Sequence, residues 1–392
     1  MRSQAKIRIK KEKDSVKTRK KRKAMPEELK GKLKMGKTAR DSKFELLRIF
    51  SMLLIILHHL ACHGRYRIDA SVPEINAFLV RAFLVGGKLG VNVFVLISGY
   101  FLADKSFNIK RLLRLLAEAM FYSGTIYLIF VFTGRVDFNF SQLIREFLPS
   151  LTGRYWFMTA YVVAYALSPF MNKALSLTSK FQHAILLVFL MFLQCVMSIW
   201  NYGYLSNTGW FLTLYVLASY IKKYGLKLMK NAVFCFVVFA VALAAMVYFY
   251  AERGYEKIYL IKHPVCVIAS VALFNGVRLI KKSFSSKIIN AVAASTLGVY
   301  LIHDNNYVRR MFLWTELLKC PQAVYKENFP WFAVLSVFGI FIACAIIDTV
   351  RRLLLEKPLF ILIDKGIDKI GDKISERRAK REQALLSETT QQ

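Results

Sequence analysis

The residue types best suited to chemistry gather in one long apolar stretch near the start of the chain. Arg48 and His59 lie eleven positions apart in it. In a helix, eleven steps of about 100° return to nearly the same face, and the rise of about 1.5 Å per residue separates the two side chains by about 16 Å. An imidazole on such a stripe can take a proton from a hydroxyl group or act as a nucleophile.

A second histidine, His58, directly precedes His59. Adjacent helical positions point about 100° apart, so only one of the two can face the stripe of Arg48. This geometry favours His59 as the catalytic residue and keeps His58 as the second candidate. The alternative is that Arg48 extends to one membrane interface and the histidines mark the other. Glu45, one turn before Arg48, is in position to pair with it.

Four further stretches carry distinctive small, polar or aromatic residues in or beside apolar segments. They are Gly90–Tyr100 (GVNVFVLISGY), Lys110–Arg114 (KRLLR), Tyr155–Met158 (YWFM) leading to Leu167–Phe170 (LSPF), and Ser295–His303 (STLGVYLIH). With the Arg-x10-His spacing, and in this order, they resemble the acyltransferase-3 family of bacterial membrane O-acyltransferases. The resemblance covers residues 42–355. The chain departs from some members by its long basic arm and by lacking an appended extracellular hydrolase-like domain.

The resemblance implies an enzyme that takes an acyl group, acetyl in the first place, from cytosolic acyl-CoA. The acceptor would be a hydroxyl of a cell-envelope or exported glycan or glycolipid. His59 would be the catalytic residue, with Arg48 orienting the donor or stabilising charge. No bound cofactor is implied, because acetyl-CoA is a donor substrate.

Three basic residues open the third apolar segment: Lys110, Arg111 and Arg114. Guanidinium groups donate paired hydrogen bonds to phosphate oxygens, and positions i and i+3 share a helix face. We therefore predict that Arg111 and Arg114 converge on the phosphates of the acyl-CoA donor, with Lys110 beside them. Ordinary anchoring by positive charge at the membrane surface is the alternative.

Two further candidates for substrate binding lie later in the chain. His303 precedes the polar run Asp304-Asn305-Asn306, which interrupts an apolar segment. Polar residues at that depth are tolerated when they line a cavity or pack inside protein. Trp156 could stack against a sugar ring, although tryptophan at a helix end more often marks the membrane interface. Asn92 and Ser98 are interpreted as helix-packing residues.

The composition indicates which elements position these residues. The chain has 392 residues, 56% of them hydrophobic, and a formal net charge of +32. Only a bilayer lets so many apolar side chains stay dry, and about 20 apolar residues are needed to cross it. We predict an all-α integral membrane protein with about ten transmembrane helices. The predicted segments are 44–62, 83–103, 112–133, 155–175, 183–200, 210–222, 231–250, 258–280, 288–310 and 331–355.

The charge distribution predicts the orientation and the domains. Residues 1–43 hold 18 Lys or Arg and no apolar run, so we interpret them as a basic, disordered cytoplasmic arm rather than a signal peptide. An even number of helices puts both termini on one side, and basic termini favour the cytoplasm. The transmembrane acyltransferase domain is predicted at 44–355, in the bacterial plasma membrane. Residues 356–392 are predicted to form a basic amphipathic segment and a polar tail.

Other functions are less favoured by the sequence. The basic arm could bind nucleic acid, but its composition also suits a segment held near anionic lipid, which we prefer.

The six cysteines form no CxxC pair, and we predict neither a disulfide framework nor a metal site. A secondary transporter or glycan flippase is the alternative function. Transporters often contain paired half-repeats with matching broken helices, and we find one interrupted segment without a partner.

Overall fold

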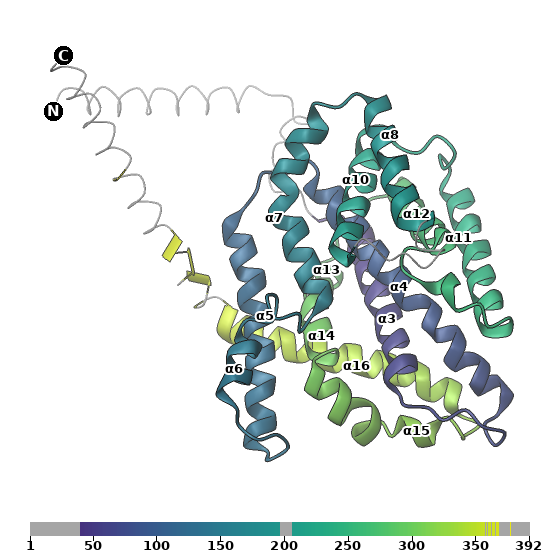
Figure 1. Cartoon of the computed structure of the whole chain (residues 1–392), viewed down its shortest axis with the longest axis vertical. Coiled ribbons are helices and arrows are strands. Elements are labelled where there is room, and N and C mark those ends of the chain that lie inside the picture. The colour runs from purple at the N-terminus through teal and green to yellow at the C-terminus, as the bar shows by residue number, and fades with distance from the viewer. Residues whose placement is uncertain are drawn as a thin grey trace.

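The computed structural model describes residues 40–196 and 206–356, with a few positions beyond Glu356. Those residues are helical and contain no strand, so the predicted all-α class is confirmed (Figure 1). The predicted arm at 1–43 and the predicted tail at 356–392 fall mostly outside the described residues.

Each of the ten predicted segments overlaps helix in the structure, although residues 197–200 of the fifth segment lie outside the described residues. The corresponding elements are α3 (Ser42–His63), α4 (Glu74–Leu102), α5 (Ile109–Phe132), α7 (Trp156–Ser176), α8 (Lys180–Met191) with η1 (Phe192–Val196), α10 (Asn207–Tyr224), α11 (Ala232–Val247) with η2 (Tyr248–Glu252), α12 (Pro264–Leu279), α13 (Lys287–Ala294) with α14 (Thr296–His303), and α16 (Phe329–Arg351) with η5 (Arg352–Glu356). Four short elements were not predicted as helices of their own. They are α6 (Phe140–Phe147), η3 (Glu256–Tyr259), η4 (Val308–Leu317) and α15 (Cys320–Ala323).

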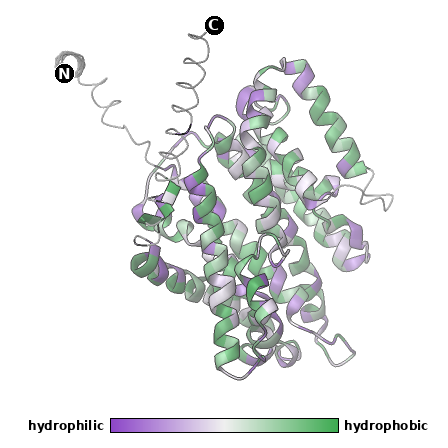
Figure 2. Cartoon of the chain, turned by 60° about the vertical axis from the view of Figure 1, so that its left-hand side comes forward, coloured by the Kyte–Doolittle hydropathy of each residue, from purple (hydrophilic) through white to green (hydrophobic). Residues whose placement is uncertain are grey.

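Five helices in the described residues are long and apolar enough to cross a membrane. They are Ser42–His63, Glu74–Leu102, Ile109–Phe132, Ala232–Glu252 and Phe329–Glu356. Shorter apolar helices cover Lys180–Val196, Pro264–Leu279 and Lys287–His303. Figure 2 shows hydrophobic residues along most of the length of the helices. The chain is therefore a helical membrane protein, while the full number of ten crossings and their direction stay predictions.

Helix α3 lies at the centre of the bundle and packs against α4, α12, α13, α14 and α16. It begins after Asp41, whose side chain accepts a hydrogen bond from the Lys43 amide and so caps the first turn. Glycines on α4 allow its close approach. A Cβ at Gly87 would overlap the His58 ring, and one at Gly90 would overlap the Ser51 carbonyl oxygen. Small residues at such crossings are typical of membrane helix pairs.

The interrupted ninth segment places His303 against α3. Helix α13 ends at Ala294, α14 continues to His303, and the chain then turns at Asp304 before the π-helical η4 begins. Because α14 packs against α3, α5 and α16, the polar run that follows His303 lies inside the bundle. Asp304 and Asn305 are both buried. This agrees with the principle that polar backbone at membrane depth is enclosed by protein.

Candidate active site

Two of the three histidines singled out in the sequence meet in the structure. His59, four residues before the end of α3, and His303, the last residue of α14, lie with Nδ1 of His59 2.9 Å from Nε2 of His303. His303 is fully buried. The fold thus joins two residues that are 244 positions apart in the chain.

The hydrogen bonds around the pair determine where the protons lie when both rings are neutral. Nδ1 of His303 is 2.6 Å from the Val299 carbonyl oxygen, which can only accept, so this nitrogen carries the hydrogen. Nε2 of His303 must then accept from Nδ1–H of His59. This assignment leaves Nε2 of His59 unprotonated, with a lone pair available to take a proton or to attack an electrophile.

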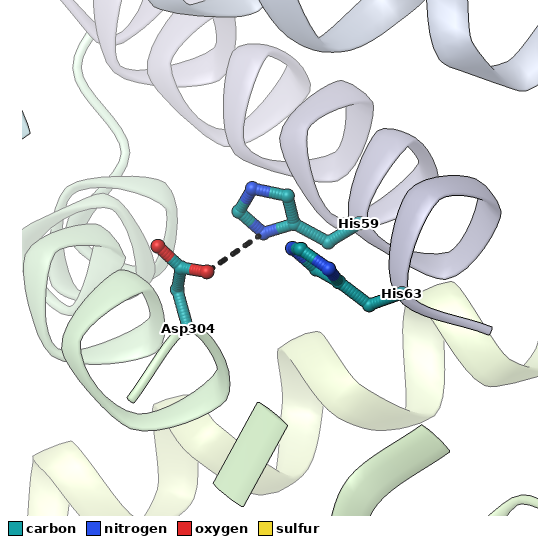
Figure 3. A group of neighbouring side chains, drawn as sticks. All are labelled: His59, His63 and Asp304. Atoms are coloured by element: carbon teal, nitrogen blue, oxygen red, sulfur yellow. Dashed lines mark ion pairs between the residues drawn. The ribbon is translucent and has the colours of Figure 1, made fainter. Parts of the chain in front are cut away.

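His63, Asp304 and Arg309 surround this pair. We call these three residues, together with His59 and His303, the histidine cluster. The Asp304 carboxylate lies 3.7 Å from Nδ1 of His59 and 2.8 Å from Nη1 of Arg309. His63 lies one turn beyond His59, and Figure 3 shows both rings and the Asp304 carboxylate converging from α3 and the end of α14. The other ring nitrogen of His59 is turned away from Asp304 (Figure 3).

His59, His63 and Asp304 have the spacing of metal ligands. One candidate ligand atom from each lies within 4.8 Å of the others, and histidine with carboxylate is a donor set that zinc accepts. However, the carboxylate already pairs with the guanidinium of Arg309, and Nδ1 of His59 bonds to His303. Because a metal ion would have to displace both partners beside a fixed positive charge, we assign no metal to this group.

His58 takes a different direction from His59. Its Nδ1 donates a hydrogen bond to the Leu84 carbonyl oxygen at 2.8 Å, and the ring packs on Gly87 of α4. His58 therefore joins α3 to α4, and it lies outside the small cavity described next. The 100° offset between adjacent positions, which favoured His59 in the sequence, separates the two rings as expected.

A small apolar cavity lies beside His59. Met52 and Ile55 of α3 line it, as do aromatic side chains of α7 and α14. Positions 48, 52, 55 and 59 share one face of α3, so the cavity follows the stripe that begins at Arg48. Trp156 forms part of the wall, and the Lys88 amino group lies 5.7 Å from the centre of its indole ring.

Positive charge gathers at the opposite end of the stripe. Arg48 pairs with Glu45 at 2.6 Å, as expected from their spacing. Lys105, in the connection between α4 and α5, lies near Arg111 and Lys222. Burial lowers the pKa of the Lys105 amino group, and the neighbouring positive charges lower it further. Such a concentration of cations suits a ligand with several negative charges.

Arg111 and Arg114 turn toward different partners. Asn108 caps helix α5, and its side chain accepts a hydrogen bond from the Arg111 amide, so both arginines fall in the first two turns of the helix. Arg111 lies over the Tyr165 ring, with 5.7 Å between the guanidinium carbon and the ring centre. Arg114 instead pairs with Asp364 at 2.7 Å. Lys110 lies beside them on α5. The predicted convergence of both guanidinium groups on one ligand is not the arrangement in this structure.

Sequence reasoning passed over Lys88, His63 and Arg309. Lys88 is a lone cation in a long apolar segment, which by itself signals a functional or tightly packed site. His63 follows His59 by four positions and so shares its helix face. Arg309 follows the polar run after His303, where a cation could have been matched to Asp304.

A comparison with protein families gives one match. A family model described as an acyltransferase domain, acyltransferase 3, matches residues 41–349, which is most of the chain. No curated protein and no solved structure matches the chain. The matched range includes both histidines of the pair, the small cavity and the positive end of α3.

Proposed function

Because the chain belongs to the acyltransferase-3 family, it is a membrane acyltransferase, and we propose that it is an acetyl-CoA-dependent O-acetyltransferase. The acceptor is a hydroxyl of a cell-envelope or exported glycan, and the enzyme works in the bacterial plasma membrane with both termini in the cytoplasm. The observation that carries this proposal is the hydrogen-bonded pair of His59 and His303, which leaves Nε2 of His59 unprotonated, in a residue that lines a cavity.

The proposed reaction moves one acetyl group and one proton. Nε2 of His59 accepts the proton of the acceptor hydroxyl while that oxygen attacks the thioester carbonyl carbon. The carbon–sulfur bond then breaks, and the sulfur of coenzyme A receives the proton from His59. The same nitrogen could instead attack the thioester first and carry the acetyl group to the acceptor. Both routes need the same unprotonated Nε2.

His303 and Asp304 act through His59 in this proposal. The acceptor nitrogen of His303 holds Nδ1–H of His59 and thereby selects the reactive tautomer. The Asp304 carboxylate at 3.7 Å favours the positive charge that appears on His59 when it takes the proton. His303 is thus a positioning residue, and this logic matches other base and orienting-group pairs in acyl transfer.

Donor binding is proposed at the positive end of α3. Arg48, Lys105 and Arg111 would hold the phosphates of acetyl-CoA, and the apolar stripe of Met52 and Ile55 would receive the acyl-bearing arm. Arg114 is assigned to holding the segment around Asp364 rather than to the donor. With donor and acceptor arriving from opposite sides, the offset between Arg48 and His59 would span the distance between phosphates and thioester.

A deletion strain tests this function in the cell. Surface polysaccharides from a strain that lacks the gene should lose acetyl groups by mass spectrometry, and the wild-type gene should restore them. The His59→Ala gene should not restore them, although its product reaches the membrane. Unchanged polysaccharide acetylation in the deletion strain would reject a glycan as the acceptor.

A further inference from the structure

A second and much larger cavity reaches the histidine pair from another side. It has a volume of about 1010 Å³ and lies between α5 and α16, with α14 and η4 as its floor. Ile302 and His303 form part of that floor. His59 lines the small cavity and His303 lines this groove, so the hydrogen-bonded pair stands between the two spaces.

The groove is apolar and continuous with the lipid-facing surface. Its rim includes Ile129 of α5, which is 51% exposed, and Trp331 and Leu335 of α16, which are 72% and 70% exposed. Both helices are long and apolar enough to cross a membrane. In a bilayer, these rim residues meet hydrocarbon, so a molecule dissolved in the membrane can enter sideways without passing through water.

The walls of the groove are mostly apolar, and Tyr122 and Thr125 of α5 and Ser336 of α16 are the polar residues among them. Arg351 lies at one end and Asn328 at the other, while Phe121, Ile126 and Leu335 supply typical wall contacts. Arg351 is already neutralised by Asp348. Between such walls most hydroxyl groups of a sugar would lack hydrogen-bond partners, whereas a hydrocarbon chain gives up no hydrogen bonds on entering.

We propose that this groove binds the hydrocarbon chain of a lipid-linked acceptor, and that the chain presents the attached sugar to the His59 and His303 pair. The proposal rests on the acyl-transfer function above and narrows the acceptor to a glycan carried on a membrane lipid. The donor then approaches His59 through the small cavity, and the acceptor approaches along the groove. The pair of histidines is where the two substrates meet.

Gly339 allows the groove to be filled without disturbing the protein. It lies on α16 in the groove wall, and a Cβ added there meets no heavy atom within 4 Å. Gly339→Trp should therefore occupy the space of the chain. Gly339→Ala controls for the loss of glycine and leaves the groove open. Ile342→Trp places the same side chain one turn away, at a position that is 53% exposed and outside the groove wall.

The first readout measures binding and does not depend on catalysis. The full-length protein is placed in vesicles of phosphatidylethanolamine and phosphatidylglycerol that contain a polyprenyl phosphate glycolipid with a diazirine in its chain. After illumination, labelled peptides should map to α5 and α16 along the groove. Labelling should fall at least fivefold in Gly339→Trp and stay within twofold of wild type in Gly339→Ala and Ile342→Trp.

The second readout separates the chain from the sugar. Acetyl transfer to the glycolipid should fall at least tenfold in Gly339→Trp, while transfer to the same sugar without a chain should stay within twofold of wild type. Equal losses on both acceptors, or no loss on either, would overturn the proposal. So would labelling that is abolished by excess unlabelled phospholipid, because the groove would then hold bulk lipid. If the wild-type protein transfers no acetyl group, the proposed function fails, and the labelling experiment still decides what the groove binds.

Discussion

Two of the clusters of ionisable side chains in the described part of this bundle are built differently. The histidine cluster contains three imidazoles around one aspartate and one arginine. The arginine cluster consists of Arg351 with Asp348 of the same helix and Glu118 and Tyr122 of α5. Each charged group placed inside a membrane costs about 2.5–3.5 kcal/mol on insertion scales, so both clusters need a compensating role.

In the arginine cluster the cation and the carboxylates pair with one another, although Oδ2 of Asp348 has no hydrogen-bond partner. The guanidinium of Arg351 lies 2.9 Å from Asp348 and 3.1 Å from Glu118, and the Tyr122 hydroxyl donates to Asp348 at 2.7 Å. These contacts join α5 to α16. In the histidine cluster, by contrast, Nε2 of His59 is unprotonated and His59 lines a small cavity. We infer that buried charge serves structure in the arginine cluster, and under the proposed function it serves reactivity in the histidine cluster. The following changes should separate the two roles.

His59→Ala should have the largest effect on activity. Removing a general base lowers the rate by about 10²–10⁴-fold, while replacing one imidazole in α3 with a small apolar side chain should leave folding intact. Acetylation of surface glycan and thermal unfolding in detergent measure the two effects. His58→Ala is the matched control and should be milder. A dead His58→Ala enzyme with a nearly normal His59→Ala enzyme would reverse the assignment of the two rings.

Arg351→Leu should instead act on stability. It leaves the carboxylates of Asp348 and Glu118 buried without their cation, and breaking a buried ion pair costs about 3–5 kcal/mol. Thermal unfolding in detergent should show the loss, and adding Asp348→Asn should recover part of it. A stable but inactive Arg351→Leu protein would show that the arginine cluster takes part in the reaction.

His303→Ala should lower the turnover number by about 10²-fold, because a misoriented base loses part of its 10²–10⁴-fold contribution. The donor KM should change little. His303→Gln should restore part of the rate, since its amide oxygen can accept from Nδ1–H of His59. Steady-state kinetics of both variants measure this. If glutamine rescues no better than alanine, the role of His303 is packing alone.

The smallest effect is expected in donor affinity. Arg111→Lys keeps the charge but loses the planar fork, so acetyl-CoA should bind more weakly by about 1–3 kcal/mol, the range for charged hydrogen bonds. Arg114→Lys is the matched variant and should leave affinity unchanged, because Arg114 pairs with Asp364. Calorimetric titration of both proteins measures the difference. Equal affinities for wild type and Arg111→Lys would leave Arg111 as a topology signal.

Periodicity in the sequence predicted the helices and the shared face of α3. The pairing of Arg48 with Glu45 also followed from spacing alone, because residues three positions apart in a helix lie side by side on one face. The contact between His59 and His303 could not follow from spacing, since 244 positions separate them. Only the motifs that resemble those of the family placed His59 and His303 in the same predicted active site.

Long side chains were the least predictable part of the site. Arg111 and Arg114 share a helix face, yet their partners are Tyr165 of α7 and Asp364 near the end of the chain. The helix face determines the direction in which a side chain leaves the backbone, whereas tertiary packing determines which partner the guanidinium group reaches. Arg309 and Lys88 escaped notice for the same reason, because their relation to Asp304 and Trp156 exists only in the folded bundle.

The central claim is that His59 performs acyl transfer from acyl-CoA. The most direct test incubates purified protein in detergent with a lipid-linked glycan acceptor and acetyl-CoA labelled in the acetyl group, and follows transfer of the label to the acceptor together with release of free coenzyme A. We predict release by the wild-type and Arg114→Lys proteins and none above background by folded His59→Ala protein. No release by the wild-type protein, or equal release by the His59→Ala protein, would contradict the account.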